Sequence, residues 1–293
     1  MKKLTLAAAL LALTAAPAGA YTSYLKPESY WPEGRTVTIV GSFANTFFTP
    51  EIALPAEVDA TTPDGSEALF GEIAVGPQAT TVNTQLPAAG TYRISTGEIV
   101  GNVTTLVGVD GNWRPLAAGE TPPEGAPVTT LQSVTLADVY VTRGQATRTV
   151  VDQAQGRLAL RPVTHPNQVL AAQGFQVDVL FNGAPLVNSA VVLYGEGDPD
   201  TRLDRFVVTD ANGRATFTFD APGHYVIAAR HRADMPAGSP AQVGSFTTTL
   251  TLEALSELPA GYDVAEREAE EDRAAARRER RERPRRRVGM RDY

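Results

Sequence analysis

The stretch Phe175-Gln-Val177-Asp-Val179-Leu-Phe181, followed at once by Asn182-Gly183, decides the fold class. Its apolar residues alternate with the others, so in an extended chain they share one face of a sheet. Asn-Gly is the dipeptide that tight β-hairpin turns favour, because both residues tolerate positive φ angles. The stretch therefore predicts a half-buried β-strand that ends in a tight turn.

A second turn signal lies further along, at Thr209-Asp-Ala-Asn212-Gly213-Arg214. It joins the run 205–209 to the run 215–219, and Asn212-Gly213 predicts a hairpin between them. The sequence Asp220-Ala-Pro-Gly223 predicts another turn, into the apolar run 225–231. Together these pieces indicate a compact antiparallel sandwich of roughly 100 residues, the size of an immunoglobulin-like module.

Short runs rich in Val, Thr, Ile and Phe, bounded by turn residues, recur from residue 35 to residue 252 with almost no helical periodicity. The pattern predicts an all-β protein of two immunoglobulin-like β-sandwich domains. The remaining expected strands are 36–43, 68–75, 81–86, 90–95, 102–109, 133–142, 157–163, 190–194 and 245–252.

Composition divides the chain into four parts. Residues 1–20 combine Lys2-Lys3, an apolar run and Ala18-Gly-Ala20, which is the pattern of a secretory signal peptide. An N-terminal sandwich is expected over 21–150, with a Pro-rich loop at 116–127, and a second, immunoglobulin-like or prealbumin-like sandwich over 151–256. Residues 257–293, dense in Arg and Glu, are expected to form a disordered tail or a solvated helix.

The signal peptide predicts export, and we expect a periplasmic protein of a Gram-negative bacterium. The chain has no Cys, which excludes disulfides, cysteine nucleophiles and the lipid-bearing cysteine of a lipoprotein. No apolar run after residue 20 approaches the ~20 residues that a membrane-spanning helix needs. Residues 21–262 carry 13 basic and 24 acidic residues, and this negative charge argues against nucleic acid as a partner.

Catalytic motifs are missing. The sequence contains no Gly-x-Ser-x-Gly elbow, phosphate-binding loop or His-Glu-x-x-His helix, so we expect a protein that is not an enzyme. The densest carboxylate cluster, at 196–204, does not fit the EF-hand spacing, and it includes Arg202 and is followed directly by Arg205. A solvated loop is the interpretation favoured for it.

Aromatic side chains gather near the start of the expected mature chain, at Tyr21, Tyr24, Tyr30, Trp31, Phe43, Phe47 and Phe48. They could form a binding platform for carbohydrate or peptide. The favoured interpretation is that they fill the core and cover the edge of the first sandwich, because a domain poor in aromatics needs its large side chains inside.

Several motifs in a fixed order resemble a bacterial periplasmic family, catalogued as a domain of unknown function and associated with nickel and cobalt uptake. The resemblance covers about residues 21–252. Its motifs here are Tyr24-Leu-Lys-Pro-Glu28, Leu160-Arg-Pro-Val-Thr-His165-Pro-Asn167, 181–186, 209–214 and Arg230-His231-Arg232.

The resemblance implies a non-catalytic accessory protein of divalent-metal uptake, with a nickel or cobalt ion as possible ligand. An uptake transporter or outer-membrane receptor would be its partner. Among the three His residues it favours His165 and His231 as metal ligands; His224 is seven residues from His231, which places the two on opposite faces of a regular strand. Family members commonly begin with a His, where this chain has Tyr21.

A purely structural role for the three imidazoles stays open, because a His in a turn or at a strand end usually satisfies a hydrogen bond. The alternative function is a cell-envelope interaction module that binds protein or glycan through its sandwich loops or through the aromatic N-terminal segment.

Overall fold

The computed structural model describes residues 21–259, which contain strands, turns and loops but no helix. The first of three sheets has five strands in the order β1-β2-β6-β5, with β3 paired to β2. Their bounds are Thr22–Pro27 for β1, Thr36–Ala44 for β2, Ile52–Ala53 for β3, Phe70–Val75 for β5 and Thr80–Gln85 for β6.

The second sheet has ten strands and runs in the order β16-β15-β18-β19-β10-β7-β4. Strand β8 pairs with β10 and β9, and β12 pairs with β19. The bounds are Asp59–Thr61 for β4, Gly90–Ser95 for β7, Ile99–Val109 for β8, Asn112–Pro115 for β9, Val128–Arg143 for β10, Val169–Leu170 for β12, Ala190–Gly195 for β15, Phe206–Val208 for β16, Gly223–Asp234 for β18 and Val243–Leu255 for β19.

The third sheet has four strands, in the order β11-β13-β14 with β17 paired to β13. Their bounds are Leu158–Pro162 for β11, Phe175–Phe181 for β13, Ala184–Pro185 for β14 and Arg214–Phe217 for β17. The turn after β13 is tight as predicted, since Asn182 and Gly183 have φ angles of 50° and 78°.

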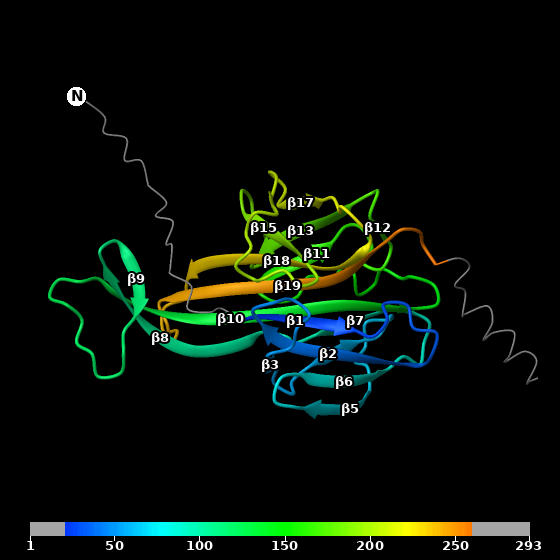
Figure 1. Ribbon diagram of the computed structural model, residues 1–293, viewed down its shortest axis with the longest axis horizontal. Helices are drawn as coiled ribbons and strands as arrows, with labels where there is room; N and C mark the ends of the chain where they lie inside the picture. The colour runs from blue at the N-terminus through cyan, green and yellow to red at the C-terminus, as the bar shows by residue number, and fades with distance from the viewer. Residues whose placement is uncertain (1–20, 260–293) are drawn as a thin grey trace, which may run out of the picture.

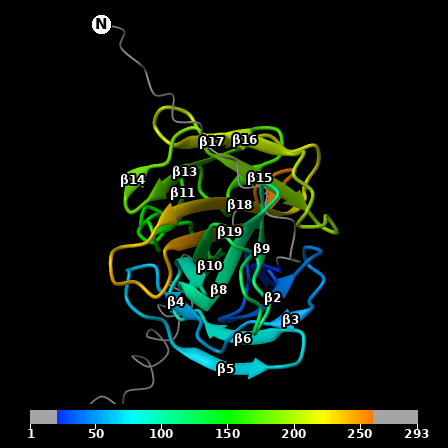
Figure 2. The same ribbon diagram turned by 90° about the vertical axis from the view of Figure 1, so that its left-hand side faces the viewer.

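The ten-stranded sheet lies between the other two sheets, so the molecule has three layers (Figures 1 and 2). On strand β18, successive side chains point to opposite faces of the sheet and so contact both neighbouring layers. Ile227 and Ala229 point into the core shared with the four-stranded sheet, whereas Val226 and Ala228 pack on the other face with Tyr24 of β1. A third cluster, which includes Val139 and Val141 of β10, fills the rest of the space against the five-stranded sheet.

Strands from both halves of the chain meet in this middle layer. Residues 131–139 of β10 pair in parallel with residues 243–251 of β19, more than a hundred positions away in the sequence. The all-β class is confirmed, and every strand expected from the sequence overlaps a strand of the structure. The division into two domains at residue 150 stays a prediction. The expected signal peptide, residues 1–20, and most of the expected charged tail lie outside the described residues.

One predicted pairing is wrong. The segment 209–214 does not close a hairpin, because β16 belongs to the ten-stranded sheet and β17 to the four-stranded sheet. The Asp210 carboxylate accepts hydrogen bonds from the N–H groups of Asn212 and Arg214, at 2.8 Å and 2.9 Å. This local turn leads the chain from the ten-stranded sheet to the four-stranded sheet. The turn residues therefore connect two layers instead of two paired strands.

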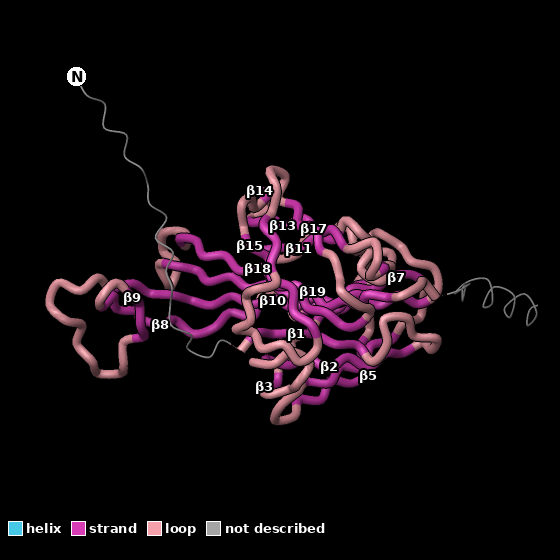
Figure 3. The backbone as a smooth tube through the Cα atoms, turned by 45° about the horizontal axis from the view of Figure 1, so that its top comes forward, coloured by secondary structure: helices cyan, strands magenta, loops and turns pink. Residues whose placement is uncertain are grey.

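An arm projects from one end of the middle sheet, formed by β8, β9 and the first half of β10 (Figures 1 and 3). The Pro-rich segment 116–127 is a loop, as predicted, and it returns along the arm. The Leu116 N–H donates to the Thr105 carbonyl and the Gly108 N–H to the Pro127 carbonyl, both at 2.9 Å.

Candidate functional site

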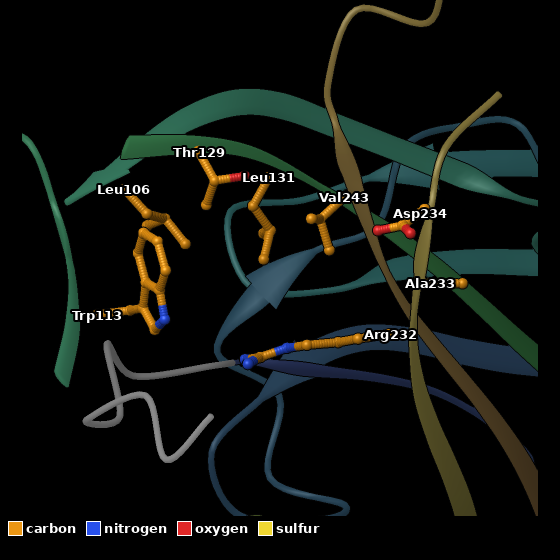
Figure 4. A pocket seen from close by; sticks show the side chains of 8 residues that line it. All are labelled: Leu106, Trp113, Thr129, Leu131, Arg232, Ala233, Asp234 and Val243. Carbon is orange, nitrogen blue, oxygen red and sulfur yellow. The ribbon is translucent and has the colours of Figure 1, made fainter. Parts of the chain in front are cut away.

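A groove lies where the arm meets the ends of β18 and β19, with a cavity volume of about 400 Å³ (Figure 4). Five strands contribute to it, so no local stretch of sequence contains the site. The lining residues are Leu106 of β8, Trp113 of β9, Thr129 and Leu131 of β10, Arg232, Ala233 and Asp234 of β18, and Val243 of β19. We call this the arm groove.

Strand register explains why these side chains share a face. Leu131 stands opposite Val243, and Val243 opposite Asp234, in adjacent strands of one sheet. Leu106 stands opposite Thr129 in the same way. Side chains directly opposite each other project from the same face, so one row of residues crosses the sheet from the arm to β18.

The arm groove combines an apolar floor with two kinds of wall. Leu106, Leu131 and Val243 form a row, Trp113 stands at the arm end, and Arg232 extends from β18 toward it (Figure 4). The indole presents a flat apolar surface, while a guanidinium and the Asp234 carboxylate supply directional polar contacts. This arrangement suits recognition of a ligand with apolar and polar parts.

A second cavity, of about 340 Å³, lies on the same face of the middle sheet. It is lined by Ala190 and Val192 of β15, Leu203, Phe206 of β16, and Ala228 and Arg230 of β18. Leu203 and Phe206 are 57% and 52% exposed, which is high for large apolar side chains. We call this the edge pocket, because β16 is the last strand of the sheet.

Polar contacts hold the beginning of β1 against β18 beside the edge pocket. The Arg230 guanidinium donates to the Tyr194 hydroxyl at 3.0 Å and to the Thr22 hydroxyl at 3.2 Å. The Thr22 hydroxyl in turn donates to the Asp200 carboxylate at 3.3 Å. Burial raises the pKa of Asp200, and the positive charge of Arg230 opposes that shift.

His165 is buried in a network of hydrogen bonds. Its Nε2 lies 3.0 Å from the Thr91 hydroxyl and 3.1 Å from the Thr147 carbonyl, and its Nδ1 accepts from the Asn167 N–H at 3.2 Å. Desolvation lowers the pKa of His165 to about 4. Both ring nitrogens are engaged, which is the hydrogen-bonding role that the sequence left open.

His231 lies elsewhere, on β18, with its ring edge-on to Phe181 at 4.5 Å. Burial lowers the pKa of His231. His231 stands opposite Phe246 of β19, and Phe246 stands opposite Val134 of β10. The hydrogen bonds of His165 lead through Thr91 to Thr142, which also lies on β10. Eight residues of a strand span roughly 26 Å, so the structure does not bring the two imidazoles together.

His224 has carboxylates near both ring nitrogens, Glu196 at 3.5 Å and Glu253 at 3.8 Å. Its ring also stacks on Tyr30, with centroids 5.8 Å apart. Among residues 21–259 no group of three or more His, Asp or Glu side chains is arranged to hold a metal ion. The metal role of His165 and His231 therefore stays a prediction.

The acidic loop and the aromatic stretch have structural partners. Asp198 accepts from the Arg202 guanidinium and from the Gly195 N–H, both at 2.7 Å, so arginines inside the loop neutralise its carboxylates. Tyr24 and Phe47 are almost fully buried, and the Phe47 ring packs against Tyr194 at 4.5 Å. Most of the aromatic stretch fills the space between two layers, as the favoured interpretation had it.

Sequence reasoning missed Trp113 and the arm groove. The signal that could have found it is a tryptophan in a very short strand beside a Pro-rich loop, far from the expected cores. The motif Arg230-His231-Arg232 lies on β18, the strand that both cavities share. Because side chains alternate, His231 faces the four-stranded layer while both arginines face the cavities.

Comparisons with known proteins describe the chain without assigning it an activity. A family model described as "Domain of unknown function (DUF4198)" matches residues 18–233. No curated protein matches the chain. The described residues include no helix of the length and apolarity that crossing a membrane would require.

Two solved structures illustrate the likeness. The D0-D1 domain of Intimin is 15% identical over 80% of this chain and 98% of that chain, with a TM-score of 0.21. Trypsin-activated alpha-2-macroglobulin from Escherichia coli is 14% identical over 81% of this chain and 16% of that chain, with a TM-score of 0.21. Neither likeness carries an argument about what this chain does.

Proposed function

Because the chain belongs to the family described as Domain of unknown function (DUF4198), a description that names no activity, we propose a function from the geometry. The chain is an exported, non-catalytic binding module of the cell envelope, and its ligand lies in the arm groove. The observation that carries this proposal is the groove itself, with an apolar floor, an accessible tryptophan and a charged wall. Export and a periplasmic location rest on residues 1–20.

Elementary energetics support binding at this place. Removing apolar surface from water stabilises a complex by about 25 cal/mol per Å², and a stacked aromatic pair adds about 0.5–1.5 kcal/mol. The floor residues belong to a continuous hydrogen-bonded sheet, so the groove is formed before the ligand arrives. A ligand then loses less free energy to ordering the protein.

Peptide display on the chain starting at Tyr21 tests the proposal. Peptides enriched on this chain should bind with micromolar dissociation constants and lose about tenfold or more in affinity with Trp113→Ala, since interface tryptophans often dominate binding. Leu69→Ala is the matched control, because Leu69 is 76% exposed and is not one of the residues that line the groove. Selected peptides that bind the parent and Trp113→Ala equally would show that the groove is not the site.

The accessory role in nickel or cobalt uptake is a finer form of the proposal, and it rests on the family resemblance. Its partner would be an uptake transporter or outer-membrane receptor. Calorimetric titration with nickel, cobalt, zinc and calcium tests it directly. Micromolar binding of one transition metal, lost in His165→Ala or His231→Ala, would support the role, and heats equal to those of dilution would oppose it.

A further inference from the structure

The last strand of the ten-stranded sheet, β16, leaves one edge of its backbone open. We propose that this edge is a second binding site, where an extended segment of another protein adds to the sheet as a further antiparallel strand. The added strand carries apolar side chains on the face of the edge pocket and hydroxyl side chains on the opposite face. The site shares no lining residue with the arm groove, so it goes beyond the proposed function.

Hydrogen bonds to β15 show which backbone groups of β16 point outward. The Arg205 carbonyl accepts from the Leu193 N–H at 2.8 Å, and the Thr209 N–H donates to the carbonyl of the residue before β15 at 3.0 Å. Along an antiparallel strand, residues that bond to one neighbour alternate with residues whose N–H and C=O groups point away from it. Phe206 and Val208 therefore direct these groups away from β15, and no other strand of residues 21–259 pairs with β16.

Two cavities flank this open edge, one on each face of the sheet. The edge pocket lies on the face of Phe206, which stands opposite Val192. On the face of Val207, a cleft of about 310 Å³ lies between β16 and β17 of the four-stranded sheet (Figure 2). An added strand would place alternate side chains in the two cavities. We call the second cavity the seam cleft, and its lining residues are Leu193, Arg205, Phe206, Val207, Thr216, Phe217, Thr218 and Asp220.

The linings of the two cavities indicate which side chains the added strand carries. In the edge pocket, Leu203 lies beside apolar residues of β15, β16 and β18. The seam cleft contains Thr216 and Thr218, and its two charged residues, Arg205 and Asp220, form an ion pair at 3.4 Å. Apolar side chains therefore fit the first face, and hydroxyl side chains fit the second.

Two other edge strands carry protection that β16 lacks. Natural proteins block open edges with bulges, charged side chains and Pro. Strand β5 has a register shift between Phe70 and Glu72, and β9 contains Arg114 and Pro115. The run Phe206-Val-Val208 has no charged residue, no Pro and no bulge. Its length of three residues limits it to pairing with a short segment.

The size of the surface favours a single strand over a second copy of the chain. Leu203, Phe206 and Val208 are 57%, 52% and 52% exposed. Together they offer roughly 250 Å² of side-chain surface, on a scale where one buried aromatic side chain accounts for about 150–250 Å². A stable dimer buries about 800 Å² from each partner. The edge therefore suits one added strand, which main-chain hydrogen bonds hold in place.

A short peptide and its N-methylated forms test the added strand. The probe is acetyl-Lys-Thr-Val-Thr-Val-Thr-Lys-amide, whose two Val residues stand opposite Phe206 and Val208 and direct their N–H groups toward β16. Calorimetric titration of the chain starting at Tyr21 should give a dissociation constant of about 100 µM or tighter. N-methylation of both Val residues should weaken binding about tenfold or more, because two hydrogen bonds are lost. N-methylation of the central Thr, whose N–H points away from β16, is the matched control and should change the affinity by less than about twofold.

Val208→Pro tests the same contact from the protein side. It removes an outward N–H that β15 does not use, so it should weaken binding of the probe about fivefold or more. Val208→Ile keeps the N–H and a β-branched apolar side chain, and it should bind the probe as the parent does. If Val208→Pro fails to fold, the three peptides decide the question.

Equal affinities of the three peptides, or no binding of the unmethylated probe, would overturn the added strand. Binding that Trp113→Ala abolishes and Val208→Pro preserves would place the probe in the arm groove. That outcome would overturn the edge site and leave the proposed function standing.

Discussion

At the scale of single residues, the polar side chains that the sequence singles out form buried hydrogen bonds. His165 and Asn167 come from one run of the sequence, Leu160 to Asn167, and both form hydrogen bonds between segments that are far apart in the chain. The Asn167 side chain accepts from the Thr142 hydroxyl at 2.8 Å and donates to the Tyr140 carbonyl at 2.8 Å. Its backbone carbonyl accepts from the Trp31 indole at 3.0 Å. This network joins β10 to the loops on either side of it.

Acid should weaken this network. The pKa of His165 is lowered from 6.5 to about 4, so the unfolded chain takes up the proton more readily than the folded chain. The contribution is fully present above pH 6.5 and is lost as the pH falls toward 4, by about 3 kcal/mol at most. Urea unfolding between pH 7.5 and pH 4.5 checks it. The parent should lose more stability than His165→Gln over this range, and equal losses would contradict the assignment.

Arg93 and Asp138 form a buried ion pair, with 2.6 Å between the guanidinium and the carboxylate and side chains 4% and 2% exposed. Asp138→Ala would leave a buried charge without its partner, so we expect a loss of about 3–5 kcal/mol in the free energy of unfolding. Replacing both residues by apolar ones, as in Arg93→Met with Asp138→Leu, should recover much of it. Urea unfolding of the single and double variants measures the difference, and a double variant no more stable than Asp138→Ala would refute this reasoning.

At the scale of elements, turns decide where each strand goes. Gly174, just before β13, has a φ angle of +79°, and a Cβ there would lie 2.3 Å from the Phe217 carbonyl oxygen. Gly183, just after β13, has a φ angle of +78° but open space around it. The two glycines differ only in crowding, which makes them a natural pair for comparison.

Gly174→Ala should therefore cost more than Gly183→Ala. Backbone strain alone costs about 1 kcal/mol in each, and the clash with β17 adds roughly 1–3 kcal/mol to the first. Thermal unfolding followed by circular dichroism measures both losses. Similar changes in Tm for the two variants would mean that β13 and β17 can separate at that point without penalty.

Sequence reasoning predicted the strands of this fold well and their partners poorly. Alternation and turn residues are local, so β13 and its Asn182-Gly183 turn could be read from a few residues. The parallel pairing of β10 with β19 depends on contacts between residues that are far apart in the chain, and no local pattern encodes it. The arm groove is missed for the same reason, since its side chains come from five strands. Very short strands such as β3 and β14 carry too few residues for a recognisable period.

At the scale of the whole molecule, the shared middle sheet should make unfolding cooperative. Neither outer layer can keep its core if β10 and β19 separate, because one face of this sheet packs against the four-stranded sheet and the other against the five-stranded sheet. We expect one transition in urea, with coincident curves from tryptophan fluorescence and far-ultraviolet circular dichroism. Two resolved transitions would instead support two independently folding sandwiches.

The arm groove is the proposed ligand-binding site of the molecule. The measurement that tests it most directly is calorimetric titration of the parent and of Trp113→Ala with the peptide that display enriches most strongly on the parent. The structure predicts micromolar binding to the parent and a loss of about tenfold or more in the variant. Equal affinities for the two proteins would contradict the claim.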